Sequence, residues 1–322
     1  MVLEHVALFC AALAMCAVSG ANDGATLAAT SSRSGAFSPL AGIGALSLAA
    51  GAAPLLVGTK VAATLAHGLV SFESGGGRLA FLSAVAIALC VVAALARRGL
   101  PTSLTMALSG AIVGVGLGDD LPTRWSTALG VLGAGIGAPF LALLVAFALA
   151  PVLRRALGDR EHAAVRGRRL GVIAFLAQSL AYGANDAEKL VAILAVATGA
   201  GTVQVHATLA GQGLIALCFG LGALTSIRAI APRLTTGMAR PSQDGTLSAL
   251  IGATAAVLGG AVIGMPLSST QAVTAALLGG SARLTPWGVR WQPVRQIFVA
   301  WVATLPLALG LGALLGAAVR LA

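Results

Sequence analysis

Apolar runs long enough to cross a membrane recur along the whole chain, and they leave little room for a water-soluble fold. An α-helix needs about 20 apolar residues to span roughly 30 Å of hydrocarbon. Only 9% of the 322 residues are charged, whereas soluble domains carry about 25%. Because some runs are short or interrupted by glycine or proline, we expect about 8–12 crossings or half-crossings. The main runs are Val2–Val18, Leu40–Val57, Leu79–Ala96, Ser126–Ala150, Leu170–Leu180, Leu209–Leu224, Leu247–Ile263 and Ile297–Val319.

The pattern within these runs favours helices over strands. The strands of an outer-membrane barrel alternate apolar and polar residues over about ten positions, and this alternation is absent. The 42 glycines and abundant alanines are typical of helices that pack through small faces, as in Gly133-x-x-x-Gly137. The predicted fold class is an all-α polytopic membrane protein, located in the plasma (cytoplasmic) membrane.

The net charge of +10 comes from arginines in short connectors rather than from a nucleic-acid-binding face. The densest group lies within 151–169, and the positive-inside tendency predicts that this segment is cytoplasmic. Cys10, Cys16, Cys90 and Cys218 lie in apolar runs without the spacing of a metal or disulfide framework. We therefore expect no cofactor, no nucleic-acid partner and no enzyme activity.

Two motifs occur twice in the same order. Gly20–Asp23, with the sequence GAND, recurs 163 residues later as Gly183–Asp186. Leu100–Ala107 recurs 165 residues later as Met265–Ala272, with a proline followed by hydroxyl residues in each copy. Two motifs at nearly one offset indicate an internal duplication, which is common in transporter folds.

The duplication divides the chain into three segments. We predict an N-terminal membrane repeat at 1–150, a basic cytoplasmic linker at 151–169 and a C-terminal membrane repeat at 170–322. An odd number of crossings in each half would make the repeats inverted, with broken or re-entrant helices that carry the motifs.

Asp23 and Asp186 end the GAND motifs and are followed by further apolar sequence, which places them at membrane depth. An ionisable residue at that depth indicates a functional site, because burying an unpaired carboxylate is costly. The preceding Gly-Ala-Asn allows a helix to break. We predict that both acids couple a cation or a proton to transport, with a bound Na⁺ as the only metal. The alternative is that each acid caps a helix at the interface.

The second motif pair predicts two anion-binding helix starts. Proline at the first helical position leaves N–H groups unpaired just beyond it, and hydroxyls add donors beside the positive end of the helix dipole. The alternative is that the hydroxyls bond back to helix carbonyls. The predicted residues are Thr102, Ser103 and Thr105 in the first half and Ser268, Ser269 and Thr270 in the second.

Acids and anion-binding helix starts in one site predict coupled transport. Two carboxylates repel an anion unless cations or protons accompany it, so the two sites fill together. A protonated phosphate can donate a hydrogen bond to a carboxylate, whereas ionised sulfate cannot, so the acids favour phosphate. Lys189, which follows the second motif, is a candidate anion contact.

These residues resemble the PiT family of inorganic phosphate transporters. The GAND motif is similar to that of each family half, and Pro101–Ala107 and Pro266–Ala272 are similar to the family signature P-[VI]-S-[ST]-T-H-A. The stretch Val294–Pro306 is similar to the family's last helix. The resemblance implies inverted repeats and phosphate uptake driven by Na⁺ or H⁺. It adds Asn22 and Asn185 to the predicted substrate-binding residues.

Two departures from the family pattern keep a second substrate open. The family's histidine is Met106 in one half and Gln271 in the other, so a sulfate or other oxyanion transporter of the same fold is the alternative. The second apolar run has no acidic residue of the kind that some sodium-coupled members carry, which favours protons. The expected partners are inorganic phosphate and membrane lipid, while a homo-oligomer and a soluble regulatory partner are left open.

Overall fold

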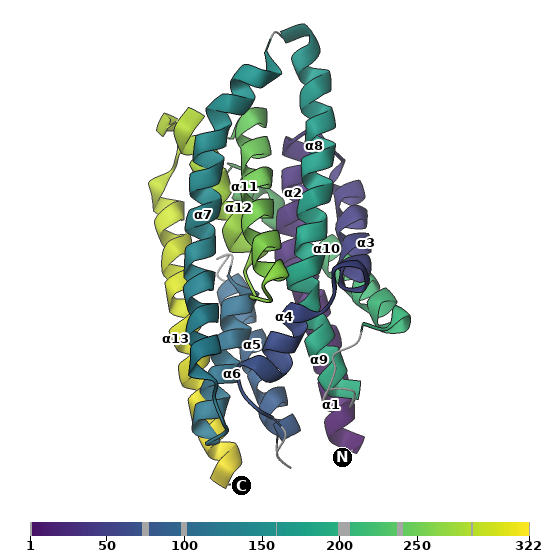
Figure 1. The fold of residues 1–322 in the computed structure, drawn as a ribbon, viewed down its shortest axis with the longest axis vertical. Helices are drawn as coiled ribbons and strands as arrows, with labels where there is room; N and C mark the ends of the chain where they lie inside the picture. The colour runs from purple at the N-terminus through teal and green to yellow at the C-terminus, as the bar shows by residue number, and fades with distance from the viewer. Residues whose placement is uncertain are drawn as a thin grey trace.

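The computed structural model describes seven stretches of the chain: residues 2–72, 77–97, 102–158, 160–198, 207–236, 241–284 and 286–321. The regular secondary structure of these stretches is helical, apart from one isolated bridge between Val70 and Thr123, and short turns connect the helices (Figure 1). The all-α class is confirmed. The elements are α1 (Val2–Ser19), η1 (Gly20–Gly24), α2 (Ala25–Arg33), α3 (Pro39–Val57), α4 (Lys60–Ala63), η2 (Thr64–Gly68), α5 (Gly77–Arg97), α6 (Leu104–Gly118), α7 (Trp125–Leu157), α8 (Arg160–Tyr182), η3 (Gly183–Ala187), α9 (Glu188–Thr198), α10 (Leu209–Thr236), α11 (Gln243–Val262), α12 (Ser269–Leu284), η4 (Pro286–Gly288) and α13 (Trp291–Leu321).

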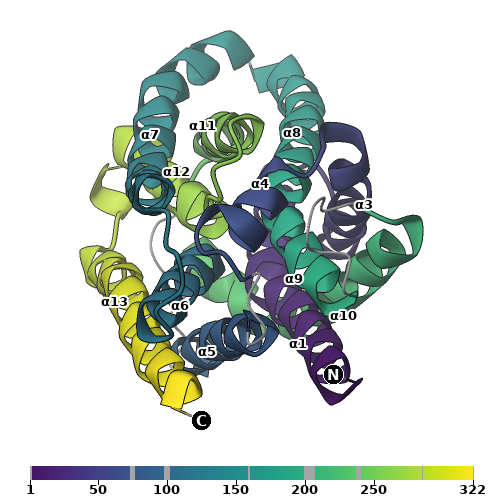
Figure 2. The ribbon, with the colours of Figure 1, turned by 60° about the horizontal axis from the view of Figure 1, so that its bottom comes forward.

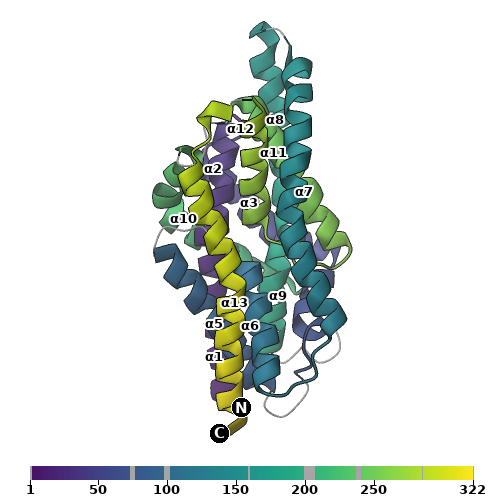
Figure 3. The same cartoon turned by 90° about the vertical axis from the view of Figure 1, so that its left-hand side faces the viewer.

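The two halves repeat one order of elements. A long helix interrupted at its GAND motif comes first, as α1–η1–α2 and as α8–η3–α9. A single helix follows, α3 or α10, then a hairpin of two helices, α5–α6 or α11–α12, and then a long helix, α7 or α13; in the first half the short elements α4 and η2 stand between α3 and the hairpin. The two hairpins enter the bundle from opposite ends, and α6 and α12 begin near its middle (Figures 1 and 3). The predicted inverted repeat is therefore consistent with the observed fold.

Each half ends in a helix that packs against the hairpin of the other half. The helix α13 lies along α6 and α5, while α7 lies along α12 and α11, as the view in Figure 2 also shows. Between α6 and α13 the contact is made by glycines: a Cβ at Gly114 or Gly118 would clash with the α13 backbone, and one at Gly312 or Gly316 with the α6 backbone. Small residues four apart on both helices permit this close approach.

The predicted packing face at Gly133 and Gly137 is wrong. A Cβ built at either glycine meets no atom within 4 Å, so this side of α7 faces away from the bundle. The spacing of small residues shows that a close approach is possible, but it does not show which helix makes one.

The distribution of side chains is that of a membrane protein. Large apolar side chains such as Leu144, Leu217 and Leu314 are exposed on the outer helices, whereas Gln178 and Lys189 are buried in the centre. Among the described residues, seven helices are long and apolar enough to cross a membrane. Adding α6, α8–α9 and α12 brings the membrane segments into the predicted range. The chain is therefore a multi-pass membrane protein, as predicted.

The division into domains stays a prediction. The helix α7 continues to Leu157 and α8 begins at Arg160, so the basic segment 151–169 contributes mainly the ends of these two helices. They extend together beyond the rest of the bundle (Figure 1).

Candidate functional site

Both GAND motifs form single turns of π-helix inside otherwise α-helical segments, η1 and η3. Such turns are frequent at functional sites, because they change the direction of side chains without ending the helix. The carboxyl groups of Asp23 and Asp186 are buried in the middle of the bundle. The structure therefore places both predicted acids at depth, which the alternative of an interfacial cap does not explain.

The first turn of α12 connects the acids of the two halves. The hydroxyl of Ser269 donates a short hydrogen bond to Asp186 Oδ2, and the hydroxyl of Thr270 donates one to Asp23 Oδ1. Because adjacent residues of one helix start contact one acid from each repeat, the two motifs meet at a single site.

Lys189 connects three parts of this site. Its Nζ lies 2.5 Å from Asp186 Oδ1, 2.5 Å from Thr105 Oγ1 and 2.6 Å from the carbonyl oxygen of Leu267. An ammonium group has three N–H donors, and these three contacts use all of them. The side chain is only 1% exposed, so the buried charge is balanced by the carboxylate beside it.

The two GAND asparagines bind the turns of the hairpins. Asn22 Nδ2 donates to the carbonyl of Thr102 at 3.2 Å and to Asp23 Oδ1 at 2.8 Å. Asn185 Nδ2 donates to the carbonyl of Met265 at 2.9 Å, and its Oδ1 accepts from the Leu267 N–H at 2.9 Å. In this structure both asparagines hold the hairpin backbone in place, and their role in substrate binding stays a prediction.

The remaining predicted hydroxyls differ in their surroundings. Ser103 caps α6 by accepting from the Met106 N–H at 3.1 Å, and Ser268 accepts from the Gln271 N–H at 3.3 Å. Thr102 Oγ1 is buried and has no hydrogen-bond partner. Of the first-half hydroxyls, that of Thr102 has no partner, whereas that of Ser103 accepts from a backbone N–H and still has its own O–H to donate. Pro101, which begins the motif, lies outside the described residues.

Three residues around the site were missing from the predicted set. Glu188 Oε2 accepts from the N–H groups of Val61 at 2.7 Å and Ala62 at 3.1 Å, so it caps the short helix α4. Ser19 and Tyr182, which directly precede the two GAND motifs, are hydrogen-bonded to each other at 2.8 Å. The sequence contains a signal for Ser19 and Tyr182, because they occupy equivalent positions before the two motifs. It contains none for the contact between Glu188 and α4.

The site offers hard oxygen ligands and hydroxyl donors but no transition-metal cluster. Across the described residues, no three or more His, Cys, Asp or Glu side chains are grouped so that they could hold a metal ion. The oxygens of Asp23 and Asp186 with the neighbouring hydroxyls are ligands of the kind that hard cations take.

Inverted repeats with broken helices are typical of secondary membrane transporters. The two acids, which lie where the two hairpins face each other, fit the same class of protein. Comparison with known proteins gives the family. The sequence profile of the phosphate transporter family matches residues 19–176 and 159–312, and the chain belongs to that family. The two matched stretches overlap between residues 159 and 176.

Individual relatives agree with this assignment. A probable low-affinity inorganic phosphate transporter of Bacillus subtilis is 26% identical over 98% of this chain and 96% of its own length. One of Mycobacterium bovis is 32% identical over 92% of this chain and 73% of its own length. A solved structure of a sodium-dependent phosphate transporter matches with a TM-score of 0.80, at 16% identity, over 99% of both chains. That structure establishes the fold.

Proposed function

We propose that this protein carries inorganic phosphate into the cell by symport with H⁺ or Na⁺, through alternating access. The observation that supports it best is the first turn of α12, where Ser269 and Thr270 present hydroxyls to Asp186 and Asp23 from opposite repeats. A helix start with hydroxyls is a site for an oxyanion, and the acids beside it are sites for protons or cations.

The charge of the site requires a coupling ion. Asp23 and Asp186 carry two negative charges when ionised, and Lys189 carries one positive charge, so the buried site is net negative before phosphate arrives. One phosphate charge about 4 Å from a carboxylate costs about 4 kcal/mol at an effective dielectric constant of about 20. A proton or Na⁺ on the carboxylates removes this repulsion, so phosphate and the cation bind favourably only together.

The hydroxyls give this coupling a physical mechanism. Each hydroxyl has one O–H to donate, and those of Ser269 and Thr270 are directed at carboxylates in this structure. When a proton or Na⁺ occupies the carboxylate oxygens, the O–H groups turn to the phosphate oxygens instead. The cation thereby releases the donors that phosphate needs.

Lys189 takes part in the same exchange. Its ammonium group bonds Asp186 and Thr105 in this structure, and phosphate offers it a second anionic partner. Neutralising Asp186 weakens its hold on the ammonium group, so Lys189 becomes an anion contact, as predicted from its position. Thr102, with its unpartnered hydroxyl, completes the set of donors from the first half.

The packing of the helices suggests which bodies move during alternating access. The helix α13 packs with the hairpin α5–α6, and α7 packs with the hairpin α11–α12. Each of these groups contains helices from both repeats, so the moving bodies are mixed groups rather than the two halves of the sequence. The broken helices α1–η1–α2 and α8–η3–α9 lie beside these groups, together with α3 and α10: α1 contacts α5, and α8 contacts α11.

Uptake by purified protein in liposomes tests the proposal. Radiolabelled phosphate is added under an imposed Na⁺ gradient or an imposed H⁺ gradient, with excess sulfate as competitor. Accumulation driven by one gradient and insensitive to sulfate is the expected result, and it also names the coupling ion. Sulfate competition at equal strength would favour the alternative of a sulfate or other oxyanion transporter, and flux without a gradient effect would refute symport.

A further inference from the structure

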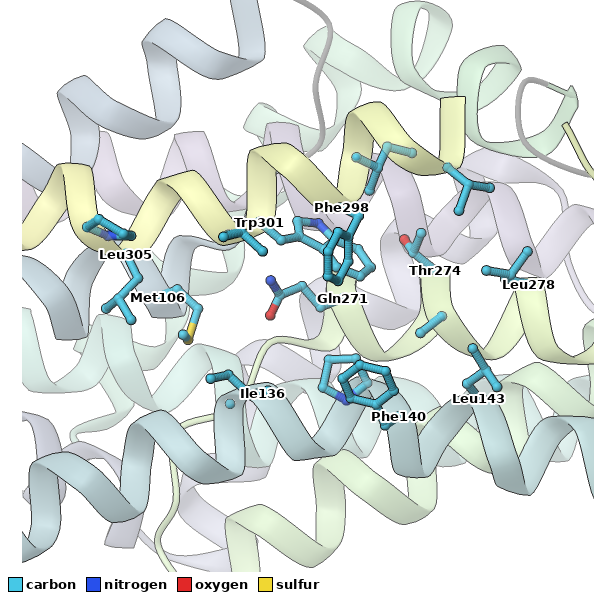
Figure 4. Close-up of a pocket in the computed structure, with 17 residues that line it drawn as sticks. Met106, Ile136, Phe140, Leu143, Gln271, Thr274, Leu278, Phe298, Trp301 and Leu305 are labelled. Atoms are coloured by element: carbon cyan, nitrogen blue, oxygen red, sulfur yellow. The ribbon is translucent and has the colours of Figure 1, made fainter. Parts of the chain in front are cut away.

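A cavity of about 560 Å³ lies between α7, α12 and α13, outside the hydrogen-bonded site. Figure 4 shows it between the facing sides of α7 and α13, with Met106 and Gln271 among the side chains that line it. These two residues directly follow Thr105 and Thr270 of the site. The cavity therefore reaches the back of both hydroxyl motifs.

Water alone does not explain a cavity of this kind. It is large enough for many water molecules, and each buried water needs two to four polar partners. The lining is apolar except for a few groups, and three polar atoms of its side chains lack hydrogen-bond partners: Gln271 Oε1, Thr274 Oγ1 and Trp301 Nε1. One or two waters satisfy these atoms, and the remaining volume requires an apolar occupant.

The packing of α13 also indicates that a molecule other than this chain covers part of its apolar surface. Ile297 forms a small cluster with Val294 and Trp301 that is separate from the main hydrophobic core. The outer wall of the cavity is open to the bilayer, since Phe140 and Phe298 are exposed. A molecule dissolved in the membrane can therefore enter from the side.

The depth of the cavity matches one leaflet of a bilayer. Along α13 its lining runs from Val294 to Pro306, which is about 18 Å at 1.5 Å per residue and slightly more than half of a hydrocarbon core of roughly 30 Å. Trp287 and Trp291 lie next to the Val294 end of the cavity and are exposed. Tryptophan is enriched at membrane interfaces. A lipid with its headgroup at that level places one acyl chain along the whole cavity.

Basic side chains at the same end favour an anionic headgroup. Arg283, Arg290 and Arg295 are exposed near the start of α13. The guanidinium of Arg283 stacks on the ring of Phe147, 5.4 Å from its centroid, which restricts its position near the cavity mouth. A planar guanidinium binds phosphate oxygens in a fixed geometry.

We propose that this cavity is a binding site for one anionic phospholipid, with an acyl chain between α7 and α13 and its phosphate on Arg283. The end of the chain contacts Met106 and Gln271, the residues next to the site hydroxyls. The bound lipid thus supports the helix starts α6 and α12 from behind. The proposal concerns lipid binding, and it is tested without measuring transport.

Two valines of α13 provide a matched pair of variants. Val302 lines the cavity and is 57% exposed, whereas Val299 is 58% exposed and does not line it. The Val302→Trp variant places a large side chain in the wall of the cavity. The Val299→Trp variant adds the same bulk to the lipid-facing surface. Delipidated protein is titrated with phosphatidylglycerol or phosphatidylcholine in detergent, and native mass spectrometry counts the bound lipids, after gel filtration and circular dichroism have verified the fold.

We expect one tightly bound phosphatidylglycerol in the wild type and in Val299→Trp, and at least tenfold weaker binding in Val302→Trp. Arg283→Gln should remove the preference for phosphatidylglycerol over phosphatidylcholine. Equal lipid binding by the two tryptophan variants, the absence of any tight lipid, or a dimer whose formation excludes lipid would each overturn the proposal.

Discussion

Ser19 Oγ lies 2.8 Å from Tyr182 Oη, and the two residues occupy equivalent positions in the two repeats, directly before the GAND motifs. Residues at equivalent positions of two symmetric halves come together only near the symmetry axis, so this hydrogen bond lies close to the pseudo-twofold axis of the fold. Ser19 also donates to Asp23 Oδ2 at 3.3 Å, and with one O–H it must then accept from Tyr182. A chain of hydrogen bonds thus connects Tyr182 through Ser19 to Asp23.

The environments of the two acids are therefore unequal. Asp23 receives hydroxyl and amide donors, whereas Asp186 is paired with the ammonium of Lys189. The position of the first repeat that corresponds to Lys189 is Thr26, whose hydroxyl bonds back to the carbonyl of Asn22 at 2.6 Å. The two repeats therefore differ at this position, and of the two acids Asp186 is the one in an ion pair with a lysine.

Removing the hydroxyl of Tyr182 should affect transport more than folding. In Tyr182→Phe, Ser19 loses its donor and Asp23 loses the end of its hydrogen-bond chain. Since one neutral hydrogen bond contributes about 1 kcal/mol, we expect a small change in thermal stability and a several-fold fall in phosphate uptake. Ser19→Ala should reproduce the effect, and wild-type uptake in both variants would remove the chain from the coupling mechanism.

The two acids should differ in their effect on stability. Asp23→Asn and Asp186→Asn should each abolish coupled uptake while both proteins still insert into the membrane. Asp186→Asn also leaves the buried charge of Lys189 without its partner, a loss that typically costs 3–5 kcal/mol. We therefore expect a clearly lower melting temperature for Asp186→Asn than for Asp23→Asn in detergent.

A double variant provides the control. Asp186→Asn combined with Lys189→Met removes both charges of the pair, so stability should recover while uptake stays absent. Equal melting temperatures for the two single acid variants would argue that Lys189 does not depend on Asp186.

The Thr102 hydroxyl should act on substrate affinity alone. It is buried without a partner, so Thr102→Val removes nothing that holds the fold together. A hydrogen bond to a charged ligand is worth about 1.5–3 kcal/mol, which predicts phosphate binding about tenfold to a hundredfold weaker at unchanged stability. Ser103→Ala, which removes the cap of α6, is the comparison and should lower stability. Unchanged affinity in Thr102→Val would exclude Thr102 from the phosphate site.

Glu188 should be a positioning residue for α4. Its carboxylate accepts from two N–H groups at the start of that helix, and α4 in turn contacts the end of α11, where Lys60 Nζ donates to the carbonyl of Val262 at 3.0 Å. Glu188→Gln keeps the acceptor and removes the charge, so it should destabilise the protein by about 1 kcal/mol. Hydrogen exchange should rise in residues 60–68, and protection equal to that of the wild type would contradict this role.

The sequence predicted the duplication, the membrane class and the meeting of both acids, because each rests on motif position or hydrophobicity. Partners far along the chain were not predictable. Glu188 contacts Val61 across 127 residues, and nothing local to either residue encodes that pairing. Likewise, Ser103 and Ser268 are predicted from the sequence to donate to a ligand. Whether a hydroxyl caps its helix or faces the site depends on side-chain orientation, which is set by tertiary packing.

The coupling between cation and phosphate is tested most directly by equilibrium binding. Phosphate affinity of the purified protein is measured at increasing proton concentration without Na⁺, and at increasing Na⁺ concentration at fixed pH, with Asp23→Asn as the control. The account predicts that affinity rises with one of the two cations in the wild type, by reciprocal coupling, and that this dependence is weakened or lost in Asp23→Asn. Phosphate affinity that is independent of both cations would contradict the account.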